Sequence, residues 1–261
     1  MKKILVLIII TLAFTRLYAT PDDADTTGQH LVISKSADSL KTSLSAIIND
    51  SLKGPAYTKI AEQYLKYDTI SSRKTRFAWQ NQSITYTMKA LHYYSKYDDT
   101  TGLRVSFDDL AKAYHAQKKY TQAKWFILQS NTLSRAKHDD LNIITSLLEL
   151  ALIKTDIKDY TLAMRDLNEA LTLSSKNHYA QLELNTMQNY AILYSHMKNY
   201  PKEARALKRR DAIADSIRHD REAVLMAKIS KADSVQSKKK LYIFASKKTF
   251  KAKYVRRIAS L

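Results

Sequence analysis

The chain has 261 residues, 43 Lys and Arg against 25 Asp and Glu, a formal net charge of +18, no cysteine, three glycines and three prolines. So few turn-forming residues leave little room for β-hairpins, and the composition favours an all-α protein. With only three scattered glycines, neither a glycine-rich dinucleotide loop nor a phosphate-binding P-loop can form. Without cysteine, the chain has no disulfide, no thiol nucleophile and no Cys-ligated metal site.

The segment 1–19 has the order of charge and hydrophobicity that is typical of an export signal. Two lysines precede an apolar run at positions 4–14, and Ala19 supplies a small residue before a cleavage point at Thr20. The run is shorter than the about 20 apolar residues of a transmembrane helix. We therefore predict a signal peptide over residues 1–19 and a periplasmic or secreted protein, with an uncleaved N-terminal anchor as the alternative. The lack of cysteine excludes a lipoprotein.

Helical periodicity begins after a lead-in at residues 20–35, which mixes Pro, Gly, Thr and Asp and is predicted to be flexible. The next apolar residues recur three or four apart on one helix face: Ala37, Leu40, Leu44, Ile47 and Ile48. Pro55 fits the first turn of a second helix. After a polar connection at residues 67–76, a third helix is predicted over about residues 77–97, with an apolar face of Ile84, Met88, Leu91 and Tyr94.

The central part of the chain repeats itself with a period of about 40 residues. Leu110-Ala111-x-x-Tyr114 recurs as Leu150-Ala151-x-x-Lys154 and as Tyr190-Ala191-x-x-Tyr194. In the same register follow Tyr120, Tyr160 and Tyr200, then Ala123, Ala163 and a displaced Ala204, then Ile127, Leu167 and Leu207. A fixed period of this length predicts stacked helical hairpins, in which each alanine allows close helix approach. The alternative is one irregular bundle with coincidental spacing.

These residues resemble the tetratricopeptide repeat, whose pattern is a large residue, a small residue and an aromatic in the first helix, then an aromatic at the turn and a small residue in the second. The resemblance covers about residues 55–215, with a degenerate first unit at Ile60-Ala61 and Tyr64. The period is longer than the family's usual length of about 34 residues, and the proline typical of the repeat end is absent. We expect an all-α solenoid over residues 36–227, closed by a basic helix, and a basic tail at residues 228–261.

The lengthened helices look like the exported sensor regions of membrane-bound regulators in Gram-negative bacteria. Such regulators continue into a transmembrane helix, but the only late apolar run here, residues 241–245, is too short to cross a membrane. We therefore expect a free-standing repeat protein.

No motif predicts catalysis, a cofactor or a metal. The seven histidines show no HExxH pattern, and the serines lie in no GxSxG motif. The acidic pairs Asp98-Asp99 and Asp139-Asp140 fit helix caps. An enzyme that uses distant carboxylates is the weakest of the alternatives.

The basic tail is predicted to attach to an anionic surface. Between residues 228 and 257, eleven Lys and Arg oppose the single acid Asp233. The residues expected to touch that surface are Lys238, Lys239, Lys240, Lys247, Lys248, Arg256 and Arg257. Envelope lipid, polysaccharide or an acidic protein suits an exported chain, whereas export argues against nucleic acid. A solvated tail without a partner is the alternative.

The resemblance implies that the first helix of each hairpin lines a concave groove. The residues half a turn from the packed face are then Asp108, Lys112 and His115, next Leu148, Leu152 and Thr155, and last Asn185, Gln188, Ile192 and Ser195. This order predicts a groove with an apolar middle and polar ends, suited to a peptide with a hydrophobic anchor. Alternatively, a neighbouring element covers the apolar residues.

The function expected from these observations is an exported, non-enzymatic scaffold that binds a peptide or protein on its concave face. The alternative is a periplasmic sensory or envelope-maintenance module that acts with a separately encoded membrane regulator.

Overall fold

The computed structural model describes the backbone of residues 37–258 and the side chains of residues 37–231; the predicted signal peptide and lead-in lie outside these ranges. Every element in the described part is helical, which confirms the all-α prediction. A helix at residues 37–45 is followed by two short 3-10 helices, η1 (Asp50–Leu52) and η2 (Leu65–Thr69). The long helices are α3 (Lys53–Tyr64), α4 (Arg73–Lys96), α5 (Thr100–Ala116), α6 (Tyr120–Ala136), α7 (Asp140–Asp156), α8 (Tyr160–Lys176), α9 (Ala180–His196) and α10 (Tyr200–Ile258).

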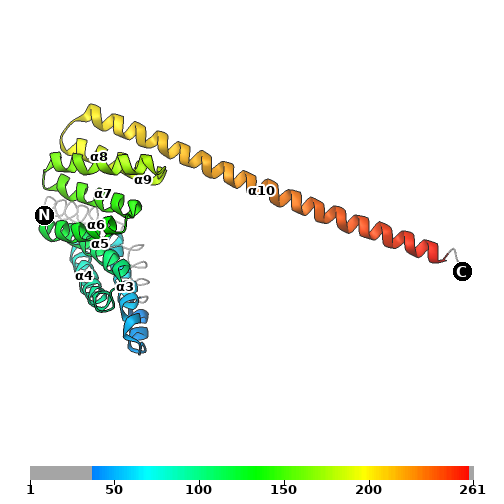
Figure 1. Cartoon of the computed structure of the whole chain (residues 1–261), viewed down its shortest axis with the longest axis horizontal. Helices are drawn as coiled ribbons and strands as arrows, with labels where there is room; N and C mark the ends of the chain where they lie inside the picture. Colours follow the sequence, from blue (N-terminus) through cyan, green and yellow to red (C-terminus); the bar gives the residue numbers. More distant parts are fainter. Residues whose placement is uncertain (1–36, 259–261) are drawn as a thin grey trace, which may run out of the picture.

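The helices form four hairpins, α3–α4, α5–α6, α7–α8 and α9–α10, stacked in chain order (Figure 1). The first helices of neighbouring hairpins touch, α3 with α5, α5 with α7 and α7 with α9. No contact of comparable extent joins the second helices to one another in the described part. The first helices are therefore crowded together and the second helices spread apart, so the stack curves with the first helices on its concave side.

The helices from α5 to α10 begin at even intervals along the chain, and the six turns that precede them share one geometry. One residue per turn adopts a positive φ between 51° and 65°, and none of these residues is glycine: Asp98, Lys118, His138, Lys158, His178 and Lys198. The next N–H bonds back to the carbonyl five residues earlier, as in Asp99 to Tyr94 at 2.9 Å. Asp99, Asp139 and Asp159 then cap the following helix, which confirms the capping role expected for the acidic pairs.

The packing of small residues confirms most of the predicted register and corrects it at one place. Ala111, Ala151 and Ala191 are at most 3% exposed. Ala204, however, is exposed, because α10 begins at Tyr200 in register and Pro201 is no insertion. The buried small residue of this helix is Ala206.

Two apolar residues predicted for inner helix faces are exposed instead. Ile48 is 98% exposed because the helix ends before it, at residue 45. Met88 is 41% exposed, and the smaller Thr87 is buried in its place. The three other members of the α4 face, Ile84, Leu91 and Tyr94, are buried or half-buried as predicted.

The ring of Tyr94 explains why two of the three glycines lie where they do. A Cβ atom at Gly102 would come within 2.2 Å of this ring, and one at Gly54 within 2.9 Å. Because these distances are too short for a Cβ atom, only glycine lets α3 and α5 approach the ring so closely.

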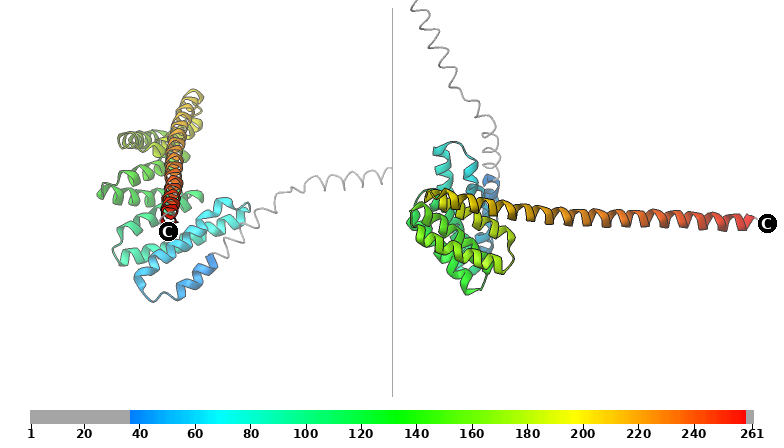
Figure 2. Two further views of the ribbon diagram at one scale, coloured as in Figure 1. Left: turned by 90° about the vertical axis from the view of Figure 1, so that its right-hand side faces the viewer. Right: turned by 90° about the horizontal axis from the view of Figure 1, so that it is seen from above.

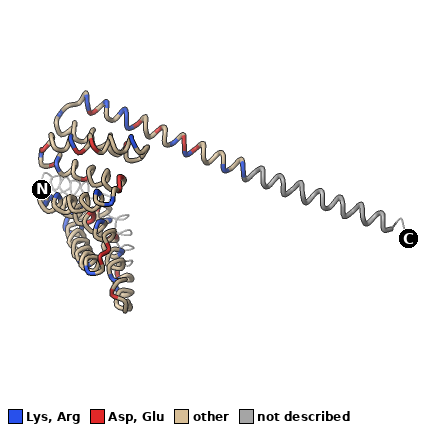
Figure 3. The backbone as a smooth tube through the Cα atoms, in the orientation of Figure 1, with Lys and Arg blue, Asp and Glu red and all other residues tan. Residues whose placement is uncertain are grey.

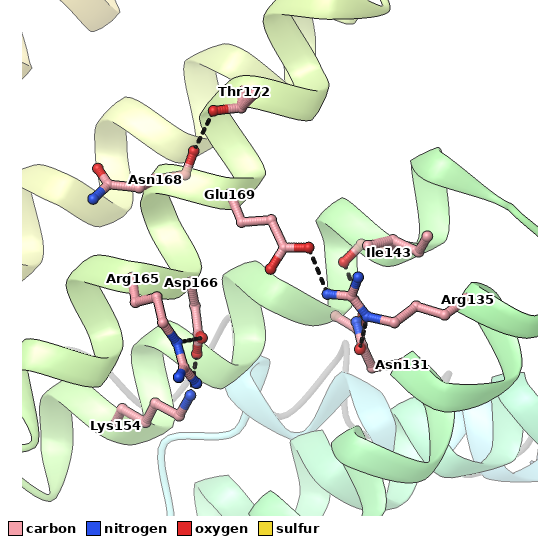
Figure 4. Close-up of polar contacts among 10 residues, drawn as sticks. Asn131, Arg135, Ile143, Lys154, Arg165, Asp166, Asn168, Glu169 and Thr172 are labelled. Carbon is pink, nitrogen blue, oxygen red and sulfur yellow. Dashed lines mark hydrogen bonds and ion pairs between the residues drawn. The ribbon is translucent and has the colours of Figure 1, made fainter.

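One pair of facing positions distinguishes the hairpins. In α5–α6, Tyr114 stacks on Phe126, with ring centroids 5.4 Å apart and planes at 3°. One repeat later, in α7–α8, the same positions hold a buried ion pair between Lys154 and Asp166 (Figure 4). Burial raises the pKa of Asp166, and the hydrogen bond from Lys154 opposes that rise. The departure of Lys154 from the repeat pattern is therefore matched by a second departure on the facing helix.

A polar chain of contacts links successive hairpins beside this ion pair. Arg135 donates to Asn131 within α6 and to Glu169 of α8, both at 2.7 Å (Figure 4). Asn131 in turn donates to Ser146 of α7 at 2.7 Å.

Helix α10 packs on α9 at its beginning and then extends beyond the stack (Figures 1 and 2). Its backbone runs through residue 228 without a break, so the predicted tail continues the helix to Ile258. Val224, Leu225, Met226 and Ile229 are exposed, and basic and acidic residues are interspersed along the described side chains of α10 (Figure 3). No helix in the described part is long and apolar enough to span a membrane. The seven basic residues predicted to touch an anionic surface lie beyond the described side chains.

Candidate functional site

A pocket of about 570 Å³ opens between the first helices of the second and third hairpins. Four elements form it: η2, the end of α5, the turn into α6, and α7. Its lining residues are Leu65, Tyr67, Asp68, Lys112, His115, Ala116, Lys118, Tyr120, Glu149 and Asp156. Because α5 and α7 are first helices, the pocket lies on the concave side of the stack.

His115 bridges α5 and α7 at the centre of this pocket. Its Nδ1 lies 2.9 Å from Glu149 Oε1, and its Nε2 lies 2.8 Å from Asp156 Oδ2. Burial disfavours the imidazolium, but the hydrogen bonds to Glu149 and Asp156 outweigh burial and raise the pKa of His115. Since both ring nitrogens are engaged, this arrangement leaves His115 no free nitrogen to accept a proton from a substrate.

Tyr67 fixes the part of the pocket that η2 contributes. Its hydroxyl donates to the backbone carbonyl of Lys112 at 3.4 Å, which ties η2 to α5. Burial raises the pKa of Tyr67, so the phenol stays neutral and remains a donor.

The charged groups left for a ligand are of both signs. Within the described part, the side chains of Lys112, Lys118 and Asp68 make no hydrogen bond or ion pair. The three basic residues of the pocket face three acids, so it is neutral when His115 is protonated. Such a site suits a peptide that offers both donors and acceptors, and no group of acids and histidines in the described residues could hold a metal ion.

Of the predicted groove residues, Lys112 and His115 line the pocket, whereas Asp108 lies outside it. Asp108 accepts from Arg104 at 2.6 Å, and burial raises its pKa. Asn185 and Ser195 are on α9, outside the pocket, and Gln188 accepts from Arg210 of α10 at 2.6 Å.

The apolar middle predicted for the groove is wrong in part. Leu148 is buried in the core with Ile144 and Leu167, and Thr155 is buried with its hydroxyl bonded to the Ala151 carbonyl at 2.7 Å. Leu148 packs among side chains of α7, α8 and α9, because the neighbouring first helices α7 and α9 touch. Leu152 and Ile192 are half-buried.

Sequence reasoning missed the acidic half of the site. Glu149 and Asp156 lie seven residues apart, so they share one face of α7. Asp68 and Tyr67 come from a connection that precedes the whole of α4 and α5, and only the packing of η2 brings them to the pocket.

Comparison with known proteins supports the fold alone. No family model matches the chain, and no curated protein matches it. A solved structure, described as the crystal structure of BtubC (BKLC) from P. vanneervenii, is similar with a TM-score of 0.56 and 13% sequence identity. The similarity covers 74% of this chain and 75% of that chain, so the helical-repeat arrangement extends over most of both.

Proposed function

We propose that this chain is an exported, non-enzymatic scaffold of the tetratricopeptide type that binds a peptide or protein partner on its concave face. The repeat type is supported by the buried residues Leu110, Ala111 and Ala123, which occupy the positions of the family pattern. The half-buried Tyr114 and Tyr120 complete that pattern in the α5–α6 hairpin.

The observation that carries this proposal is the mixed-charge pocket around His115. It is the meeting point of two first helices, and its ammonium groups at Lys112 and Lys118 have no ion-pair partner in the described part. A carboxylate of the partner would replace water at these lysines, and a partner cation would find Asp68 on the facing wall.

The test is recovery of a partner from envelope extracts with residues 20–261 as bait. We expect a discrete protein that is retained by the natural chain and lost with Lys112→Glu and Lys118→Glu together. Lys158→Glu is the matched control, because Lys158 occupies the same turn position one hairpin later and lies outside the pocket. Equal capture by the pocket variant and the control would contradict the concave site.

Export is tested separately by N-terminal sequencing of the native protein. Cleavage after Ala19 should leave Thr20 as the first residue. Recovery of an intact Met1 in the membrane fraction would replace secretion with anchoring.

The basic end of α10 is proposed to attach the scaffold to anionic envelope lipid or polysaccharide. Its support is the excess of eleven basic residues over one acid between residues 228 and 257, on a helix that projects from the stack (Figure 1). Vesicles with anionic lipid should retain the chain at low salt and release it at high salt. A chain truncated after Lys231 should not be retained, and retention by neutral vesicles would contradict the electrostatic account.

The alternative, a sensory or envelope-maintenance module acting with a membrane regulator, is favoured by one feature of α10. Val224, Leu225 and Met226 are exposed on a helix that leaves the stack, as expected of a segment that packs on another protein. Capture of a membrane-embedded regulator that depends on Leu225 and not on Lys112 would support this alternative over the concave scaffold.

A further inference from the structure

The last hairpin, α9–α10, is hollow where the two preceding hairpins are filled. One position of the second helix recurs with the repeat period. It holds Phe126 in α6, Asp166 in α8 and Ala206 in α10. In α5–α6 the Phe126 ring stacks on Tyr114, and in α7–α8 Asp166 pairs with Lys154. In α9–α10 the tyrosine remains, as Tyr194, and its ring stacks on Tyr190 of the same helix with centroids 5.9 Å apart, but the facing position of α10 offers only the methyl group of Ala206. A pocket of about 350 Å³ is found there.

The floor of this α9–α10 pocket is apolar and its side chains are held in place. It consists of Met187, Tyr190, Tyr194 and Ala206. The Tyr190 hydroxyl donates to Asn168 of α8 at 2.5 Å, and the Tyr194 hydroxyl donates to the sulfur of Met164 at 3.7 Å. Because the phenol ends are anchored on α8, the rings do not collapse into the space that a larger residue fills in the other hairpins.

The rim of the pocket is basic. Lys202, Arg205 and Arg209 surround it. Arg209 is paired with Glu183 at 2.8 Å, and the Lys202 ammonium lies 5.6 Å from the centre of the Tyr194 ring. Neither Arg205 nor Lys202 has a carboxylate partner within the described residues, so the rim keeps two cations for a ligand.

We propose that the α9–α10 pocket binds a large apolar side chain that is flanked by carboxylates, as part of an acidic peptide segment. The apolar side chain would take the place that Phe126 holds in α5–α6 and stack on Tyr194. The flanking carboxylates would pair with Arg205 and Lys202, where Arg offers a bidentate contact. The volume lies at the low end of the range for ligand pockets, which suits one anchoring side chain and not a large cofactor.

This site is separate from the concave pocket around His115. It lies between the two helices of one hairpin, whereas the concave pocket lies between the first helices of two hairpins. An experiment that refutes binding at one of the two pockets therefore does not refute binding at the other.

The experiment measures binding of fluorescein-labelled peptides by anisotropy, with the full exported chain. The probe is Asp-Glu-Phe-Glu-Asp, and the comparison peptides replace Phe by Ala or the four acids by Lys. We expect the acidic Phe peptide to bind at least tenfold more tightly than either comparison, and its affinity to fall as salt rises.

Variants at one helix turn provide the matched controls. Ala206→Phe should fill the pocket and lower affinity at least tenfold, with a melting temperature equal to or above that of the natural chain. Ala204→Phe places the same side chain on the exposed side of α10 and should bind like the natural chain. Arg205→Glu should weaken binding and reduce its salt dependence.

Equal affinity of the Ala206→Phe and Ala204→Phe variants would overturn the proposal, as would equal binding of the Phe and Ala peptides. If Ala206→Phe fails to fold, Ala206→Leu and Arg205→Glu decide the matter by the same criteria. Binding of dodecanoate in the pocket by a chain that ignores the acidic Phe peptide would also overturn it, because the occupant would then be an amphiphile and not a peptide.

Discussion

The buried ion pair of α7–α8 can be tested against the uncharged aromatic pair that α5–α6 holds at the same positions. The side chains of Lys154 and Asp166 are each 5% exposed, and the same positions one hairpin earlier hold Tyr114 and Phe126. Removing one partner leaves the other charge buried. Lys154→Met alone and Asp166→Leu alone should therefore each lower the free energy of unfolding by about 3–5 kcal/mol.

The double variant Lys154→Met with Asp166→Leu should be as stable as the natural chain or more stable, by up to about 4 kcal/mol, because no charge is left to desolvate. The double variant Lys154→Tyr with Asp166→Phe should behave alike, since it copies the stacked pair of α5–α6. Urea denaturation at pH 7 measures all four variants. A double variant destabilised by the sum of the two single losses would refute the reasoning.

The pH dependence of the single variants provides an independent check on the same pair. In Lys154→Met, the loss of stability should shrink as the pH falls, because Asp166, whose pKa burial already raises, takes up a proton and becomes neutral. Asp166→Leu has no carboxyl group at this position, so its loss of stability should not shrink as the pH falls. The same pH trend in both variants would contradict this account.

Three further predictions concern single positions. The pKa of His115 is raised above 6.5 in the folded chain, so its contribution to stability should be full below that pH and should be lost as the pH rises. The fall of the melting temperature over this pH range should therefore be absent in His115→Gln. Burial raises the pKa of Asp109 to about 6, so Asp109→Asn should stabilise the protein at pH 7.5 by at most about 3 kcal/mol and much less at pH 4, as measured by urea denaturation. Lys158→Gly should stabilise by about 1 kcal/mol in urea denaturation because φ is 65° there, whereas Lys158→Ala should not.

The repeat was readable from the chain because its cause is local. The helices α5 to α9 all have the same length of 17 residues. Each is followed by a short turn closed by the same backbone hydrogen bond, from an N–H to the carbonyl five residues earlier. The alanines at positions 111, 151 and 191 are buried, as the repeat register predicts. The turns lack only the usual glycine signal, because polar residues such as His138 adopt the positive φ that glycine would adopt more readily.

The candidate groove was predicted only in part because its residues depend on how hairpins stack. Lys112 and His115 were placed on the concave side from α5 alone. Thr155, one repeat period after His115, is buried instead, and so is Leu148. The partners of His115 come from α7, and a helical wheel of α5 contains no information about them.

The sequence by itself determined the helical class, the even spacing of the helices and the residues that make each hairpin close-packed, because these depend on contacts within a hairpin and its neighbour. Only the tertiary structure decided which unlike residues compensate one another. The pairing of Lys154 with Asp166, and the space left beside Tyr194 by Ala206, arise from side chains on facing helices. The pattern of buried residues along one helix cannot identify such pairs, because the interaction free energy of a pair depends on both of its residues.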